Sequence, residues 1–282
     1  MTLFFSPGSN EEIMSTPVKV EFAVQMTCQK CVDSIKNTLE GVDGVSSLDI
    51  NLAQEQVIVE SILPSSQLLE LLESTGRRAL IKGQGVSTDK HLGAAVSILD
   101  TPHDGPIRGV IRMLQLANNS CIIEGTVDGL TPGAHALNIH EYGDLSDGCN
   151  SCGMHFNPTN SRHGGPSDEE RHHGDLGNVV ADDNGRAVFR MENDRVQVWD
   201  VIGRCMVMHS REDDLGQGDT PNSKQDGNSG PGVACGIIAR SAGLFENVKK
   251  ICQCDGVSLW DERDVPLAGP GRQEHQQKQS QL

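Results

Sequence analysis

Residues Gly133 to Gly177 read GAHALNIHEYGDLSDGCNSCGMHFNPTNSRHGGPSDEERHHGDLG, and this stretch decides the fold and the chemistry of the chain. It holds six of the ten histidines together with a spaced aspartate, in a glycine-rich context. Imidazole nitrogens and a carboxylate oxygen on one folded loop are donors suited to tetrahedral zinc. The alternative is a polar surface loop whose histidines are incidental. We predict a zinc site with four ligands: His155, His163, His172 and Asp175.

An alternating run lies just upstream of these residues. Positions 136–140 read ALNIH, and this alternation predicts a β-strand whose even-numbered side chains share one face. His140 is on that face, so a second metal could lie between the strand and the zinc loop.

Uncommon short motifs of this region and beyond resemble the Cu,Zn superoxide dismutase family, in nearly the family's order and spacing. They are HFNP, RHGGP, ERHHGDLGNV, VIGR, DDLG, GNSG and ACGII, and they fall between about Leu92 and Arg240. The resemblance assigns zinc to the same four residues and makes His155 an imidazole shared with copper. It places His140 and His209 at copper-ligand positions.

The same resemblance implies three further features. Cys149 and Cys235 occupy the positions of the family's intrasubunit disulfide. Asp213 of DDLG would hydrogen-bond histidines of both metal sites. The family's dimer contact corresponds to Ile202, Gly203 and Arg204.

Two departures from the family pattern predict an impaired copper centre. The dismutase strand carries a His-x-His pair, and Asn138 stands at the first of those positions, although an amide is a poorer copper ligand than imidazole. The family also places an arginine that guides superoxide just before the second disulfide cysteine. Here the segment 231–235 reads PGVAC, without a cation.

The first part of the chain has a different pattern. Residues 18–83 read as βαββαβ, which is a ferredoxin-like arrangement. Cys28 and Cys31 of MTCQKC lie at a loop-to-helix junction, where backbone N–H groups and the helix dipole favour thiolates. Two adjacent soft thiolates suit Cu(I). The motif and its frame resemble the heavy-metal-associated domain, and the alternatives are a thioredoxin-type redox pair or two buried small hydrophobes.

From Leu92 onward, short β segments follow one another at steady spacing between Gly, Pro, Asn and Asp residues. This pattern predicts an antiparallel Greek-key β-sandwich or barrel, in which Cys121 and Cys205 are ordinary core residues. The chain is therefore predicted to be multidomain. The expected segments are a disordered leader (1–14), a heavy-metal-associated domain (15–83), a polar linker that leaves the domains independent (84–91), a dismutase-like domain (92–240) and a C-terminal segment (241–282).

The C-terminal segment contains a second thiol pair. Cys252 and Cys254 are one residue apart and follow Lys249 and Lys250, whose charges favour thiolates. In a flexible segment such a pair can accept Cu(I) or exchange with a partner's disulfide. Two surface cysteines without function are the alternative.

Composition excludes several classes of partner. The 282 residues carry a net charge of −16, which argues against binding to nucleic acid or to anionic membranes. The N-terminal residues fit neither a signal peptide nor a membrane span, so we expect a cytoplasmic protein. Nine cysteines without a secretory signal then favour metal or redox chemistry over structural disulfides.

Taken together, the MTCQKC domain, the dismutase-like domain and the CQC segment resemble the copper chaperones for superoxide dismutase. The resemblance implies that Cys28 and Cys31 acquire Cu(I) and that the chain, a homodimer at rest, forms a heterodimer with a dismutase subunit. It also implies that Cys252 and Cys254 transfer copper and oxidise the target's disulfide. Two alternatives stay open: an active Cu,Zn superoxide dismutase with an appended copper-loading domain, since His209 restores a copper ligand, and a copper-buffering or thiol-redox protein without a dismutase partner.

Overall fold

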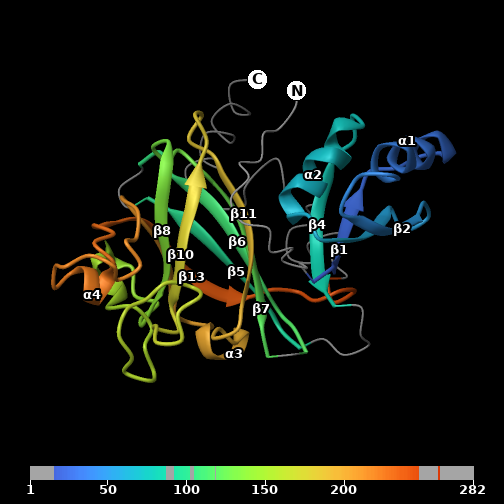
Figure 1. Cartoon of the computed structure of the whole chain (residues 1–282). Coiled ribbons are helices and arrows are strands. Elements are labelled where there is room, and N and C mark those ends of the chain that lie inside the picture. Colours follow the sequence, from blue (N-terminus) through green and yellow to red (C-terminus); the bar gives the residue numbers. More distant parts are fainter. Residues whose placement is uncertain (1–15, 87–91, 102–104, 118, 248–259, 261–282) are drawn as a thin grey trace.

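The computed structural model describes residues 16–86, 92–101, 105–117, 119–247 and 260, which form two adjoining β units (Figure 1). The first is a four-stranded sheet with two helices, and the second is a closed eight-stranded barrel. This confirms the predicted combination of a ferredoxin-like domain with an all-β domain. None of the helices described is long and apolar enough to cross a membrane. The predicted leader 1–14 and residues 87–91 of the predicted linker lie outside the described residues.

The first unit has the predicted βαββαβ order, and its strands pair antiparallel in the order β2-β3-β1-β4. Apolar residues of β1 alternate with polar ones, and Val20 and Phe22 are fully buried against the helices. The helix α1 begins directly after Cys28, whose extended backbone occupies the N-cap position. The elements of the first unit are β1 (Val18–Val24), α1 (Gln29–Leu39), β2 (Val45–Asn51), β3 (Gln56–Ser61), α2 (Ser65–Ser74) and β4 (Ala79–Gly85).

The second unit closes in the order β10-β11-β7-β6-β5-β13-β12-β8, with β8 also paired to β10. Its strands are β5 (Ala94–Asp100), β6 (Arg108–Gln115), β7 (Cys121–Asp128), β8 (Gly133–His140), β9 (Ser146–Cys149), β10 (Asp175–Ala181), β11 (Ala187–Asn193), β12 (Cys205–His209) and β13 (Gly232–Arg240). Short helical turns are η1 (Asn150–Cys152), α3 (Val198–Val201) and α4 (Ser223–Asp226).

Strand alternation separates the barrel core from the site. Leu137 and Ile139 of β8 and Met206 and Met208 of β12 belong to the hydrophobic core cluster of the barrel. The intervening side chains therefore point outward. All residues of β12 are nevertheless buried, because long loops cover this outer face. The side chains that carry the chemistry consequently lie between the barrel wall and its loops.

The two units share a buried interface, unlike the independent domains that the polar linker suggested. Arg190 of the barrel pairs with Glu124 at 3.3 Å and also donates to the carbonyl of Leu63. The Glu124 carboxylate in turn accepts from the backbone N–H of Ser65 and from the Gln84 amide. The composition of a linker does not show whether the domains that it joins have complementary surfaces. Here the facing surfaces of the two units are complementary.

The chain leaves the barrel and returns to the first sheet. The backbone N–H of Phe245 donates to Glu21, and that of Gln84 donates to the carbonyl of Ala242. Further on, the Arg78 guanidinium lies over the Trp260 ring, with its Cζ atom 5.6 Å from the ring centroid. The start of the C-terminal segment is thus attached to the ferredoxin-like unit.

Candidate metal centres

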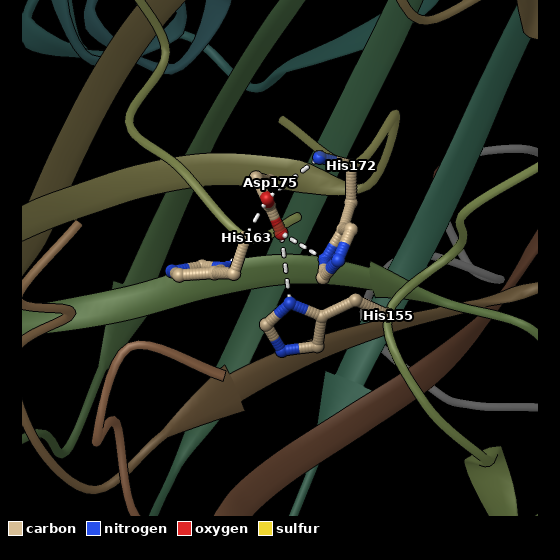
Figure 2. A group of neighbouring side chains, drawn as sticks. All are labelled: His155, His163, His172 and Asp175. Carbon is tan, nitrogen blue, oxygen red and sulfur yellow. Dashed lines mark hydrogen bonds and ion pairs between the residues drawn. The ribbon is translucent and has the colours of Figure 1, made fainter. Parts of the chain in front are cut away.

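The four predicted zinc ligands converge on one point (Figure 2). Asp175 begins β10, and the three histidines come from the loop before it. One Asp175 oxygen accepts from Nδ1 of His155 at 2.8 Å and Nδ1 of His172 at 3.2 Å, and the other lies 3.1 Å from Nδ1 of His163. All four side chains are buried, and their potential ligand atoms lie within 4.8 Å of one another. Three imidazoles and one carboxylate in this geometry fit tetrahedral zinc.

Strong electrostatic coupling marks this cluster. Burial alone would disfavour the charged forms, but the hydrogen bonds that His163 donates to Asp175 and Asp213 outweigh it and raise the pKa of His163 to about 10. Hydrogen bonds from His155, His163 and His172 likewise outweigh burial and lower the pKa of the Asp175 carboxyl. A buried carboxylate that is surrounded by imidazoles has the charge that a divalent cation requires.

Asp213 holds the zinc-side imidazole in place from the loop after β12. Its Oδ1 accepts from Nε2 of His163 at 2.8 Å and from the backbone N–H of Leu215. Gly227 has a positive φ of 65°, and a Cβ there would meet Asp213 and His163, so the close approach requires glycine. The Oδ2 atom of Asp213 is buried without a hydrogen-bond partner. The predicted link from Asp213 to both metal sites is therefore present on the zinc side alone.

Three histidines form a second cluster beside the first. Nδ1 of His140 donates to the carbonyl of Gly153, and Nδ1 of His209 donates to the carbonyl of Gly230. Each donation leaves a lone pair on Nε2, and these two Nε2 atoms face each other at 3.2 Å. Nε2 of His155, also without a hydrogen-bond partner, belongs to the same cluster. Burial lowers the pKa of His140 to about 3 and that of His209 to about 4, so the lone pairs are available at neutral pH.

Asn138 is the residue that the sequence comparison predicts in place of a fourth copper ligand. It pairs with Asp175 on one side and Val207 on the other, on the strand that carries His140. Its side chain is fully buried, and neither amide atom has a hydrogen-bond partner. The described residues thus bring three imidazoles together here, and the impaired copper centre stays a prediction.

The Cys28 and Cys31 thiols lie together at one end of the ferredoxin-like unit. Their Sγ atoms are 3.7 Å apart, with Cys28 exposed and Cys31 mostly buried. Hydrogen bonds from the Thr27 backbone, the Arg77 side chain and the Cys28 backbone lower the pKa of Cys31 to about 6. Cys31 is therefore a thiolate at neutral pH. The sequence motif identified the two cysteines but gave no signal for Arg77. This residue lies in the loop before β4 and reaches Cys31 from there.

Of the two cysteines predicted in the barrel core, Cys121 lies there and Cys205 does not. The structure records all seven cysteines in its described part as free thiols, so the disulfide between Cys149 and Cys235 stays a prediction. Cys149 packs against a buried cluster that contains Cys235, Cys152 and Cys205. Cys205 is thus not in the barrel interior but on the outer face of β12 with His209. The alternation of β12 could have revealed this, because Cys205 and His209 are four residues apart on one strand.

The predicted dimer contact lies at an exposed apolar surface. Ile202 is 38% exposed, and the nearby Ile237 and Trp199 are 44% and 57% exposed. Arg204 instead faces the protein: it donates to the carbonyls of Asp200 and Glu141. Cys252 and Cys254 lie outside the described residues.

Comparisons with known proteins agree with this architecture. The heavy-metal-associated domain model matches residues 21–78, and the copper/zinc superoxide dismutase model matches residues 107–238. The chain is 56% identical to the Homo sapiens copper chaperone for superoxide dismutase over 98% of this chain and 99% of that protein. It is 37% identical to the Arabidopsis thaliana chloroplastic/cytosolic copper chaperone over 86% of this chain and 69% of that one. A crystal structure of the clock protein EA4 covers 54% of this chain and 97% of its own, with 40% identity and a TM-score of 0.50.

The two relatives named as copper chaperones align over 98% and 86% of this chain. With its thiol pair, its zinc-type cluster and its incomplete copper-type cluster, the chain belongs to the family of copper chaperones for superoxide dismutase.

Proposed function

We propose that this protein is a metallochaperone that binds Cu(I) and delivers it to Cu,Zn superoxide dismutase. The observation that carries the proposal is the pair of Sγ atoms of Cys28 and Cys31, 3.7 Å apart. Metal–sulfur bonds of about 2.3 Å allow two sulfurs at this separation to share one ion. One thiol is exposed and the other ionised, so a partner's thiolate can attack the bound Cu(I) and take it by ligand exchange.

In this proposal the barrel is a docking domain whose loops are held by zinc. The ligands would be His155, His163, His172 and Asp175, which tie the long loop after β8 to β10. Zinc supplies a fixed cross-link there and no catalytic step. Asp213 would keep the His163 ring in its ligand orientation.

The docking surface is the exposed apolar patch of Ile202, Ile237 and Trp199, together with Gly203. A Cβ at Gly203 would meet nothing within 4 Å, so the side-chain direction of this glycine is open to a partner. Clustered exposed apolar side chains typically mark protein interfaces. We infer that this surface binds a second copy of the chain at rest and a dismutase subunit during transfer.

The C-terminal segment would complete the transfer. Residues 241–247 and Trp260 contact the ferredoxin-like unit, and Arg78, which lies over the Trp260 ring, is next in sequence to Arg77, the partner of Cys31. Cys252 and Cys254, between these anchors in sequence, are proposed to receive Cu(I). As a disulfide, the pair would oxidise two target thiols to a disulfide and return to the dithiol by exchange. The expected segment boundaries (1–14, 15–83, 84–91, 92–240 and 241–282), the Cys149–Cys235 disulfide and a cytoplasmic location belong to the same proposal.

The alternative of an active dismutase has less support. Its copper would depend on His140, His155 and His209, with Asn138 in place of a fourth imidazole. The relatives that match nearly the full length are named as chaperones and not as enzymes.

The test mixes Cu(I)-loaded full-length protein with zinc-loaded, disulfide-reduced dismutase and follows target activity and complex size. We expect activation together with a one-to-one complex. The paired change Cys28→Ser and Cys31→Ser should abolish activation, whereas Cys121→Ser, a buried thiol remote from the copper motif, should leave it intact. Dismutation by this protein alone, without activation of the target, would refute the chaperone assignment.

A further inference from the structure

Three cysteines from separate elements meet between the barrel wall and the loop that covers it. Cys205 begins β12, Cys235 lies in β13, and Cys152 ends η1. Cys235 pairs with Val207, which shares a face of β12 with Cys205, so two thiols are diagonal neighbours on the sheet. The loop brings Cys152 onto them, with its Sγ 3.6 Å from the carbonyl of Asp144. The three Sγ atoms lie within 4.8 Å of one another.

Burial and mutual contacts raise the pKa values of thiols in this cluster. Cys152 and Cys205 are fully buried, and Cys235 is 4% exposed. A hydrogen bond with Cys205 lowers the pKa of Cys152, but a hydrogen bond with Cys235 and burial outweigh it and raise that pKa to about 12. Contacts with the other two thiols and burial also raise the pKa of Cys205. Without a metal, Cys152 and Cys205 are therefore neutral thiols.

The spacing fits one metal ion. Metal–sulfur bonds of about 2.3 Å place three sulfurs about 4 Å apart around a trigonal centre, so shifts below about 1 Å suffice. A surface pocket of about 230 Å³ reaches Cys235, and its lining includes the carboxylate-bearing Asp100 and Asp147. A cation thus has a route to the cluster past acidic side chains.

We propose that Cys152, Cys205 and Cys235 form a buried three-coordinate Cu(I) site, distinct from the Cys28–Cys31 pair and from the histidine clusters. Soft thiolates select Cu(I), whereas zinc sites made of thiolates require four ligands in a tetrahedron. Cys149 packs against the cluster but is not one of the three converging thiols. On binding, Cu(I) leaves its carrier thiols without changing oxidation state, and each cysteine that ligates it releases its proton to water.

The site also responds to the state of Cys235. A disulfide between Cys149 and Cys235 would remove one of the three ligands, so Cu(I) binds here while Cys235 is a free thiol. The proposed site would then be present in reduced protein and lost in oxidised protein.

The experiment uses the full-length, zinc-loaded, reduced chain in which the four copper-motif cysteines are changed to serine: Cys28, Cys31, Cys252 and Cys254. Cu(I) is added anaerobically in the presence of a competing Cu(I) chelator, and the bound metal is studied by X-ray absorption. We expect one tightly held Cu(I) with three sulfur neighbours at about 2.3 Å. Zinc retention and circular dichroism report on folding.

Two further variants locate the site. Adding Cys205→Ser or Cys152→Ala should abolish the tight Cu(I) binding, whereas Cys121→Ser, a fully buried barrel cysteine outside the cluster, should preserve it. Nitrogen neighbours around copper, retention in both cluster variants, or preferential binding of Zn(II) with four sulfurs would each overturn the proposal. If a cluster variant unfolds, the number of sulfur neighbours in the parent protein still decides.

Discussion

Changing Arg77 to glutamine tests how the copper motif keeps a thiolate ready for metal. Four hydrogen bonds lower the pKa of Cys31 from 9.0 to about 6: those with the Thr27 backbone, the Arg77 side chain, the Cys28 backbone and the Cys28 thiol. At pH 7 this pKa gives about 90% thiolate, against about 1% for an unperturbed thiol. If these hydrogen bonds contribute similarly, Arg77→Gln leaves the midpoint near 7 and the thiolate at about half.

Alkylation by iodoacetamide measures this midpoint, because the thiolate is the reactive species. The rate at Cys31 is followed by peptide mass spectrometry in metal-free Cys28→Ser protein between pH 4 and 10. Lys30→Gln is the matched control, since it removes an exposed cation of the same motif that does not contribute to the lowered pKa. A wild-type midpoint above 8, or identical profiles for wild type and Arg77→Gln, would refute the reasoning.

The sign of the pH effect on copper follows from the same shift. Above about pH 6 the Cys31 thiol has already lost its proton, so Cu(I) displaces none from Cys31 there. Below that pH the proton displaced from Cys31 should weaken Cu(I) binding by a further factor of about ten for each pH unit.

Three other changes test the barrel and the interface. Asp175→Asn removes a proposed zinc ligand and the acceptor for the three histidines, so zinc affinity should fall more than about 100-fold. Unchanged zinc content after dialysis against a chelator would contradict the proposed site. Asn138→His supplies a fourth imidazole to the His140 cluster and should raise Cu(II) affinity at least about tenfold. Electron paramagnetic resonance would show the added ligand as additional nitrogen coupling. An unchanged spectrum would show that Asn138 is not what weakens copper binding at this cluster. Arg190→Met removes the ion-pair partner of the buried Glu124, although Arg112 stays beside it, and should lower the unfolding free energy in urea by about 3–5 kcal/mol. A loss below about 1 kcal/mol would mean that the ion pair is dispensable.

The zinc cluster was predictable because its donors are concentrated in one loop. His155, His163 and His172 lie within 18 residues of one another, and Asp175 begins the next strand. Histidine is scarce enough that such a cluster indicates metal without knowledge of the fold. The motif around Cys28 and Cys31 was predictable for a similar reason, since both ligands lie in one turn at the start of a helix.

The three-thiol cluster could not be predicted in this way. Cys152, Cys205 and Cys235 are 53 and 30 residues apart, and each separately reads as a small buried hydrophobe. The buried pair of Glu124 and Arg190 was equally hidden, because charged residues in strands normally face water.

The sequence by itself determined the local properties of this protein: which residues alternate along a strand, where α1 begins after Cys28, and which donors are grouped in one loop. These depend on interactions between near neighbours in the chain. The tertiary structure alone decided that Cys205 meets Cys152 and Cys235, that Asp213 reaches a single histidine, and that the two units share a core. Such meetings depend on strand register and loop closure over long separations, and no local pattern of residues specifies them.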